Sequence, residues 1–252
     1  MKAGSIVWMG CLALALSASA HAAPESFDVW LKADITIAAD GSIESLEWNK
    51  EPQARQVLQA KVEPLVRRWE FIPGSVDGRR ARTETYLRVQ VLGTAQPDGT
   101  LMLKFGKAST GAKPGTLMPP MYPRDAVTGG ISGAVTSIVA IDAAGVLTLE
   151  SSEFHGTRYR KQFVAAAESA VKGWTFDLER VAGHPVPAKL SVPISFCVGK
   201  NRSVPPAVAD CMKQLRKADD SSALAAAPGP SEDAAPLSSV VQLVTQVSGQ
   251  EI

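Results

Sequence analysis

The chain has 252 residues, of which 45% are apolar, and it carries 26 basic against 25 acidic residues. This length predicts one or two domains, and the apolar content excludes a globally disordered chain. The near-zero net charge argues against broad electrostatic capture of nucleic acid or of an acidic membrane surface.

The first 22 residues have the pattern of an export signal. Lys2 supplies a positive start, Ile6 to Leu16 is apolar, and Ala20 and Ala22 are small residues at candidate cleavage positions. The apolar stretch is shorter than the roughly 20 residues that span a bilayer. We therefore expect residues 1–22 to be a cleaved signal peptide. An uncleaved membrane anchor and a lipoprotein are the alternatives.

Residues 23–106 are predicted to form a first domain. Apolar residues alternate with polar ones over Phe27 to Ala38, which indicates a strand, and a turn at Asp40-Gly41 leads to a second strand over Ile43 to Trp48. A helix is expected to open at Pro52. Its apolar face comprises Leu58, Val62, Leu65, Val66 and Trp69. Pro64 predicts a kink in this helix, or a restart near Glu63.

A third strand is expected over Tyr86 to Leu92. The turn sequence Pro97-Asp98-Gly99 and the alternating Leu101, Leu103 and Phe105 then predict an added hairpin that covers an edge of the first sheet. Residues 107–116 are rich in small and polar residues, and we expect them to be the linker to a second domain at 117–217.

The second domain repeats the pattern of the first. Tyr122-Pro123 precedes a strand, Gly130 and Gly133 mark a turn, and an alternating run ends at Asp142 to Gly145. An Ala-rich helix ends in Trp174-Thr175-Phe176, and a last strand is predicted up to Phe196. Trp69 and Phe71 lie about 105 residues before Trp174 and Phe176, as do Leu87, Val89 and Val91 before Val192, Ile194 and Phe196. We interpret this offset as a tandem repeat of one unit.

The order strand, turn, strand, helix, Trp-x-Phe, strand resembles the TonB C-terminal domain family over about 75 residues, from Tyr122 to Phe196. The resemblance implies a periplasmic, Gram-negative envelope protein that contacts a receptor segment by strand addition, through the last strand and the Tyr-Pro region. The first copy is degenerate, because it lacks the Tyr-Pro segment, and binding is not expected there. The fold class expected is α+β: two tandem small domains, each an antiparallel sheet with a helix packed on one face.

The last predicted strand carries three odd-numbered prolines, Pro185, Pro187 and Pro193. Because backbone N–H groups alternate sides along a strand, the donors missing at these prolines lie on one side, and that side should face away from the sheet. Lys189, Ser191 and Ser195 then remain as outward donors. The residues predicted to bind a partner are Tyr122, Pro123, Lys189, Leu190, Ser191 and Ser195. The alternative is a proline-blunted edge that binds nothing.

The chain beyond Phe196 departs from the family pattern. Cys197 and Cys211 are the two cysteines left after signal cleavage, and in an oxidising compartment they predict a disulfide. A short helix is expected before residue 217, and residues 218–252 are expected to be mostly disordered. The apolar run Val240 to Val247 either shares that disorder or is a strand that docks on a partner or on the chain's own edge.

No residue cluster indicates catalysis, a metal site or a cofactor. His155 and His184 are predicted in exposed turns, and Trp69 and Trp174 in the core. The basic group Arg79, Arg80, Arg82 and Arg88 indicates a solvated turn and strand face, or a contact with lipid headgroups or an acidic partner.

These features favour a periplasmic TonB-like adaptor that binds an outer-membrane receptor or another envelope protein, with no enzyme activity. One alternative is an anchored energy transducer that works with ExbB and ExbD. Another is a structural envelope protein, in which case a homo-oligomer assembles through sheet edges.

Overall fold

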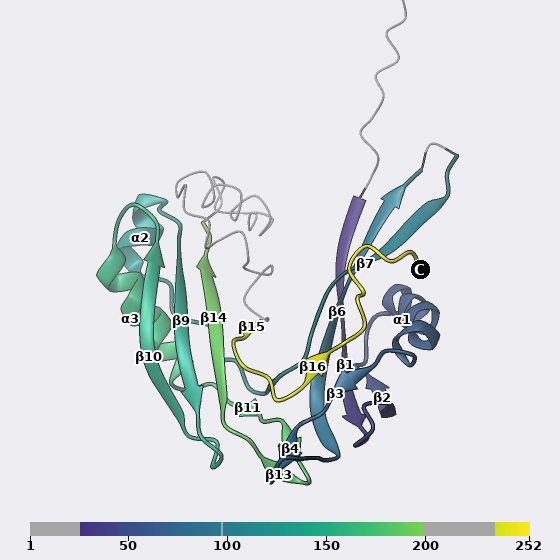
Figure 1. The fold of residues 1–252 in the computed structure, drawn as a ribbon. Coiled ribbons are helices and arrows are strands. Elements are labelled where there is room, and N and C mark those ends of the chain that lie inside the picture. The colour runs from purple at the N-terminus through teal and green to yellow at the C-terminus, as the bar shows by residue number, and fades with distance from the viewer. Residues whose placement is uncertain (1–25, 97, 199–234) are drawn as a thin grey trace, which may run out of the picture.

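The computed structural model describes residues 26–96, 98–198 and 235–252, and Figure 1 shows them as two strand-rich halves. The α+β class is confirmed, because antiparallel sheets are combined with few helices. The elements of the first half are β1 (Ser26–Ile37), β2 (Ile43–Trp48), α1 (Gln53–Val66), β3 (Phe71–Ile72), β4 (Ser75–Val76), β5 (Arg79–Arg80), β6 (Thr83–Ala95) and β7 (Leu101–Ser109).

The second half and the C-terminal segment follow in chain order. Their elements are β8 (Lys113–Pro114), α2 (Arg124–Gly129), β9 (Gly133–Ile141), β10 (Leu147–His155), α3 (Arg160–Val171), β11 (Phe176–Asp177), β12 (Arg180–Val181), β13 (His184–Pro185), β14 (Ala188–Phe196), β15 (Ala235–Pro236) and β16 (Gln242–Leu243). The predicted signal peptide, Cys211 and the short helix expected before residue 217 lie outside the described residues. No helix in the described part of the chain has the length and apolarity needed to cross a membrane.

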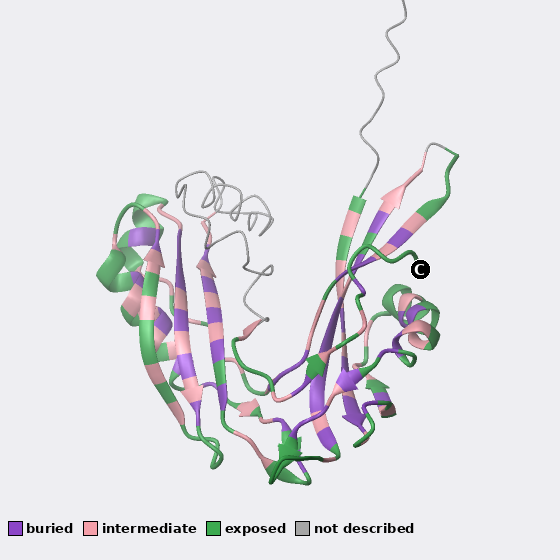
Figure 2. Cartoon of the chain, in the orientation of Figure 1, coloured by how far each residue is buried: buried purple, intermediate pink, exposed green. Residues whose placement is uncertain are grey.

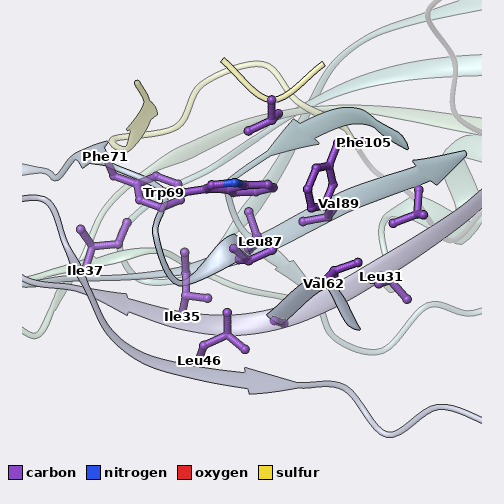
Figure 3. Packing of buried hydrophobic residues seen from close by; sticks show 14 of the residues in the cluster. Leu31, Ile35, Ile37, Leu46, Val62, Trp69, Phe71, Leu87, Val89 and Phe105 are labelled. Carbon is purple, nitrogen blue, oxygen red and sulfur yellow. The ribbon is translucent and has the colours of Figure 1, made fainter. Parts of the chain in front are cut away.

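The first sheet is built around β1, which pairs with β2 on one side and with β6 on the other. Alternation of apolar residues in β1 and β6 gives the sheet one dry face, and α1 packs on it through Val62 and Val66. Trp69 is 3% exposed, and its ring meets that of Phe105 edge-on at 5.2 Å, as Figure 3 shows. The predicted core role of Trp69 is confirmed.

Pro64 does not divide the first helix, contrary to the expected restart near Glu63. Helix α1 continues through Pro64 to Val66, and the N–H of Arg67 donates to the carbonyl of Glu63. The proline lies in the last turn, where only a short stretch of helix follows it, so the lost hydrogen bond is tolerated there.

The second sheet is built in the same way, with β9 between β10 and β14. Helix α3 covers one face through Phe163, Ala167 and Val171, which are buried with the apolar residues of β9 and β14. Trp174 is also buried, and its Nε1 donates to the carbonyl of Met118 at 2.8 Å. The order of elements from strand to helix to hairpin to strand is thus the same in both halves, and origin from one duplicated unit stays an interpretation.

The two halves are joined by shared strands. Strand β12 of the second half pairs with β6 of the first, at Thr83 and Glu84, and β7 pairs with β6 further along, from Arg88 to Ala95. The predicted added hairpin does pair with the edge of β6, but only over part of its length. Strand β12 of the second half pairs with a further part of the edge, at Thr83 and Glu84. Figure 1 shows the connection where the two halves approach each other near β4, β11 and β13.

The linker predicted at residues 107–116 is ordered and partly buried. Its first residues belong to β7, Thr110 and Ala112 are buried, and Lys113 and Pro114 form β8, which pairs with β11. Composition alone indicated flexibility, but the backbone groups of this segment find partners in both halves, such as Thr85 for the N–H of Gly111 and Thr175 for the N–H of Gly115, which fixes its conformation.

Residues 235–252 are ordered, contrary to the predicted mostly disordered tail. Strand β15 pairs with β14, β16 pairs with β3, and the last residues pair with β7. Val241 and Val247 are buried in the core of the first half. The apolar run at 240–247 therefore docks on the chain itself, because burial of these valines offsets the ordering cost. Figure 2 shows this segment as mostly exposed and intermediate, in keeping with Val241 and Val247 being its buried residues.

We predict that replacing both Val241 and Val247 by Ala lowers the free energy of unfolding by about 3 kcal/mol, because buried methyl groups are removed and cavities remain. Denaturant titration of the whole chain measures this. The matched control is Val244→Ala, at a residue that is 53% exposed, and it should change stability by less than about 0.5 kcal/mol. Equal effects of the two changes would mean that the segment does not contribute to the core.

Candidate functional site: the outer edge of β14

The outer edge of β14 is the side that faces away from β9. The N–H of Leu237 donates to the carbonyl of Lys189 at 2.9 Å, and the N–H of Lys189 donates to Oγ of Ser238 at 3.1 Å. Both backbone groups of Lys189 thus point away from β9. Because this orientation alternates along a strand, odd-numbered residues present their groups outward, and Pro193 lies on that side. The side inferred is confirmed for Pro193, whereas Pro185 lies in β13, paired with Arg180, and Pro187 precedes β14.

The chain's own C-terminal segment lies on this edge. Pro236 is opposite Leu190 and Ala235 is opposite Ser191, in antiparallel register. Among the described residues, the pairing of β14 with β15 extends no further than Ser191. The edge therefore accepts an added strand, and at Lys189 to Ser191 that strand is residues 235–238. We name this segment, Ala235 to Ser238, the edge segment.

The edge segment is seated against the connection between the halves. A Cβ atom added at Gly111 would lie 2.6 Å from Cβ of Pro236, so only glycine lets the proline approach this closely. Leu237 in the same segment is 54% exposed. The side chain at 236 is thus in contact with the protein, while the one at 237 faces mainly solvent.

A buried carboxylate fixes the chain directly after the edge segment. Glu179 is 4% exposed and accepts three hydrogen bonds: from Thr85 Oγ1 at 2.7 Å, from Ser239 Oγ at 2.8 Å and from the N–H of Val240 at 3.0 Å. Thr110 Oγ1 lies 3.0 Å from Ser239 Oγ and donates to the carbonyl of Val241. Glu179 therefore connects both halves and the C-terminal segment at one point.

A polar cavity of about 320 Å³ adjoins Glu179, where the first sheet meets the connection and β12. Lys113 forms an ion pair with Asp34 at 2.7 Å on its wall. The described residues hold no group of three or more His, Cys, Asp or Glu side chains placed to bind a metal ion.

The structure separates the residues predicted to bind a partner into two groups. Tyr122 packs edge-on against Phe163 and Phe196, and its hydroxyl donates to the carbonyl of Ile131 at 2.8 Å. Burial raises the pKa of this phenol, and a hydrogen bond with the Ser132 hydroxyl opposes the rise. Pro123 is the residue before α2. Phe196, which Tyr122 contacts, is seven positions along the extended strand from Lys189, or about 23 Å. Tyr122 therefore lies far from the part of the edge at Lys189.

Within β14 the predicted residues differ in what they can offer. Lys189 and Ser191 lie on the outer edge beside the edge segment, and the Lys189 ammonium forms an ion pair with Glu150. The Leu190 side chain is buried in the core, so it cannot contact a partner in this state. Ser195 is half-buried near the other end of the strand. Cys197 is disulfide-bonded, and its predicted partner Cys211 lies outside the described residues.

Two predictions about polar side chains were wrong. His155, expected in an exposed turn, is 4% exposed at the end of β10, with Nε2 3.3 Å from Thr136 Oγ1. Arg88, expected on a solvated face, is 3% exposed, and its guanidinium lies beside Gly111 in the connection between the halves. His184 is exposed, as expected, and lies in β13. Of the other arginines, Arg79 and Arg80 are exposed and Arg82 pairs with Glu44 and Glu84.

Sequence reasoning missed Glu179, Thr85 and the edge segment. The first two carry no motif, and they meet only because β12 pairs with β6. The one available signal was the apolar run at 240–247, whose docking brings Leu237 and Ser238 to the edge.

We predict that Glu179→Ala lowers the free energy of unfolding by about 2 kcal/mol or more, because buried donors lose their acceptor. Asp177→Ala, two residues away and exposed, is the control and should change stability by less than about 0.5 kcal/mol. Thermal and denaturant unfolding of both variants measure the difference. A Glu179→Ala variant as stable as the control would contradict a role for the carboxylate in holding the three segments together.

The second half of the chain, which contains this edge, is similar to known proteins. The family model for the Gram-negative bacterial TonB protein C-terminal covers residues 118–198. Two curated relatives, both named Protein TonB and both from Xanthomonas campestris pv. campestris (strains B100 and ATCC 33913), are 36% identical over 80 residues, which is 32% of this chain.

The matched region is 35% of the length of each relative, so the chain spans about a third of the curated relatives that it matches. The match contains α2, β9, β10, α3 and β14, which together form the second sheet and its helices. Residues 118–198 of this chain therefore belong to the TonB C-terminal domain family.

Proposed function

We propose that the chain is an exported, periplasmic TonB-like adaptor, and that it binds a segment of an outer-membrane receptor or of another envelope protein by strand addition at the outer edge of β14. The observation that carries the proposal is the geometry of Lys189, whose N–H and carbonyl both point outward and both bond to an antiparallel segment. An edge that accepts one extended segment has the hydrogen-bonding pattern needed to accept another.

The edge also limits what can bind. Proline at 193 removes one outward donor, so a long uninterrupted ladder cannot form there. A short partner segment that bonds at Lys189 and Ser191 is compatible with this pattern. The exposed face near Lys189 and Glu150 carries an ion pair rather than an apolar pocket, so affinity comes mainly from main-chain hydrogen bonds.

We predict that Ser191→Pro abolishes receptor binding, because it removes the outward N–H at the centre of the edge, whereas Ser191→Ala keeps that N–H and binding. The measurement is affinity capture from solubilised envelope with the mature chain, with captured receptors identified by mass spectrometry. Circular dichroism checks that both variants fold. Capture that survives Ser191→Pro, or no receptor captured by the Ser191→Ala chain, would contradict strand addition at this edge.

A structural role in the envelope is the second candidate, and the internal filling of edges favours it. Strand β12 and β7 cover β6, the C-terminal residues pair with β7, and β15 pairs with β14. In that role the chain would have no receptor, and copies would assemble through edge strands such as β2 and β10. Sedimentation would then show oligomers, whereas the adaptor is expected to sediment as a monomer.

A further inference from the structure

The edge segment has the features of a ligand that the chain supplies to itself. It is extended, it runs antiparallel to β14, and both its polar contacts with Lys189 are made at the outward groups that strand addition requires. We propose that residues 235–238 act as a built-in competitor for the β14 edge, and that the partner is an uncharged extended segment of the same kind: small residue, proline, any non-proline residue, hydroxyl residue. This inference rests on the proposed function.

The register explains why a proline suits the second position. Pro236 is opposite Leu190, an even-numbered residue whose own N–H and carbonyl face β9. At such a non-hydrogen-bonded pair the partner's nitrogen also points away from β14, so a proline there costs no ladder bond. Its ring instead contacts Gly111, which has no side chain to block it.

The position opposite Lys189 explains what the third residue of the segment, Leu237, must supply. Leu237 is opposite Lys189 and needs its N–H, which donates to the Lys189 carbonyl at 2.9 Å. Its side chain is 54% exposed, so the edge does not require leucine in particular. Ser238 supplies an acceptor for the Lys189 N–H through its hydroxyl. Selection therefore acts on the proline, on the following N–H and on the hydroxyl.

The segment is held close to the edge but weakly on it. On its C-terminal side, Ser239 and Val240 bind Glu179, and Val241 is buried in the first core. This anchor keeps the edge segment at a high effective concentration, in the millimolar range or above for so short a connection. By contrast, β15 itself has two residues and Leu237 and Ser238 are exposed. Such a strand can leave the edge while the anchor stays in place.

The test uses a double variant, Leu237→Pro with Ser238→Ala, which removes both contacts with Lys189 and leaves Val241 and Val247 unchanged. A proline at 237 favours extended backbone at 236, so the change is local. The control is Leu237→Ala, which keeps the N–H. The probe is a fluorescein-labelled peptide with the sequence of residues 233–239, Asp-Ala-Ala-Pro-Leu-Ser-Ser, and the readout is fluorescence anisotropy with the mature chain.

We expect the double variant to bind the peptide at least about tenfold more tightly than the wild-type chain and the Leu237→Ala control. Each hydrogen bond lost from the edge segment shifts the closed-to-open ratio by roughly fivefold, and a site that is open more often has a proportionally lower apparent Kd. Adding Ser191→Pro should abolish binding in every background. Amide hydrogen exchange at Lys189 should rise in the double variant, which checks release directly.

The outcomes separate this inference from the proposed function. The wild-type chain and the double variant could bind the peptide equally well, with binding lost in both on Ser191→Pro. The edge would then bind peptides without competition from residues 235–238, which would overturn the competitor proposal. Release at Lys189 with no peptide binding would overturn the partner chemistry proposed here. A double variant that binds the peptide yet captures no envelope receptor would overturn the proposed function and leave the competitor in place.

Discussion

Backbone groups at the edge of a β-sheet must find hydrogen-bond partners, and this requirement organises the whole chain. The long strand β6 has β1 on one side, and β7 and β12 on the other. The outer side of β7 is met by the last residues of the chain, with the N–H of Ile252 donating to the carbonyl of Leu103. The edge of β14 is met by β15. The fold is therefore connected by edge pairing between segments that are distant in sequence.

These pairings differ in strength, and the difference matters for function. The C-terminal residues on the first half are held by Val241 and Val247 in the core and by the Glu179 junction. The edge segment on β14 has exposed residues at 237 and 238, and within the described residues none of its side chains is buried in a core. Competition with an external strand is consequently easiest at β14. In this chain the β14 edge of the TonB C-terminal domain is thus partly occupied. Whether another strand can reach that edge depends on the C-terminal segment.

The sequence was sufficient for features that depend on local periodicity. Alternation and helical spacing placed Trp69 and Trp174 in two cores, and the odd-numbered position of Pro193 correctly indicated the outward side of β14. It was insufficient where distant segments meet. Arg88 and His155 looked exposed because nothing nearby in sequence covers them, and Glu179 had no motif. The tail's composition indicated disorder, but its ordering depends on surfaces that only the folded halves provide.

The central claim is that an extended segment pairs with β14 at Lys189 to Ser191 and can be exchanged for another. The most direct measurement is isotope-filtered NMR of the labelled mature chain, observing contacts between backbone protons of Ser191 and Ala235, which are opposite each other in the register. The account predicts that these contacts are present in the free chain and are replaced by contacts from Ser191 to an unlabelled peptide of residues 233–239 added in excess. Contacts that are absent in the free chain, or that persist unchanged while the peptide binds elsewhere, would contradict it.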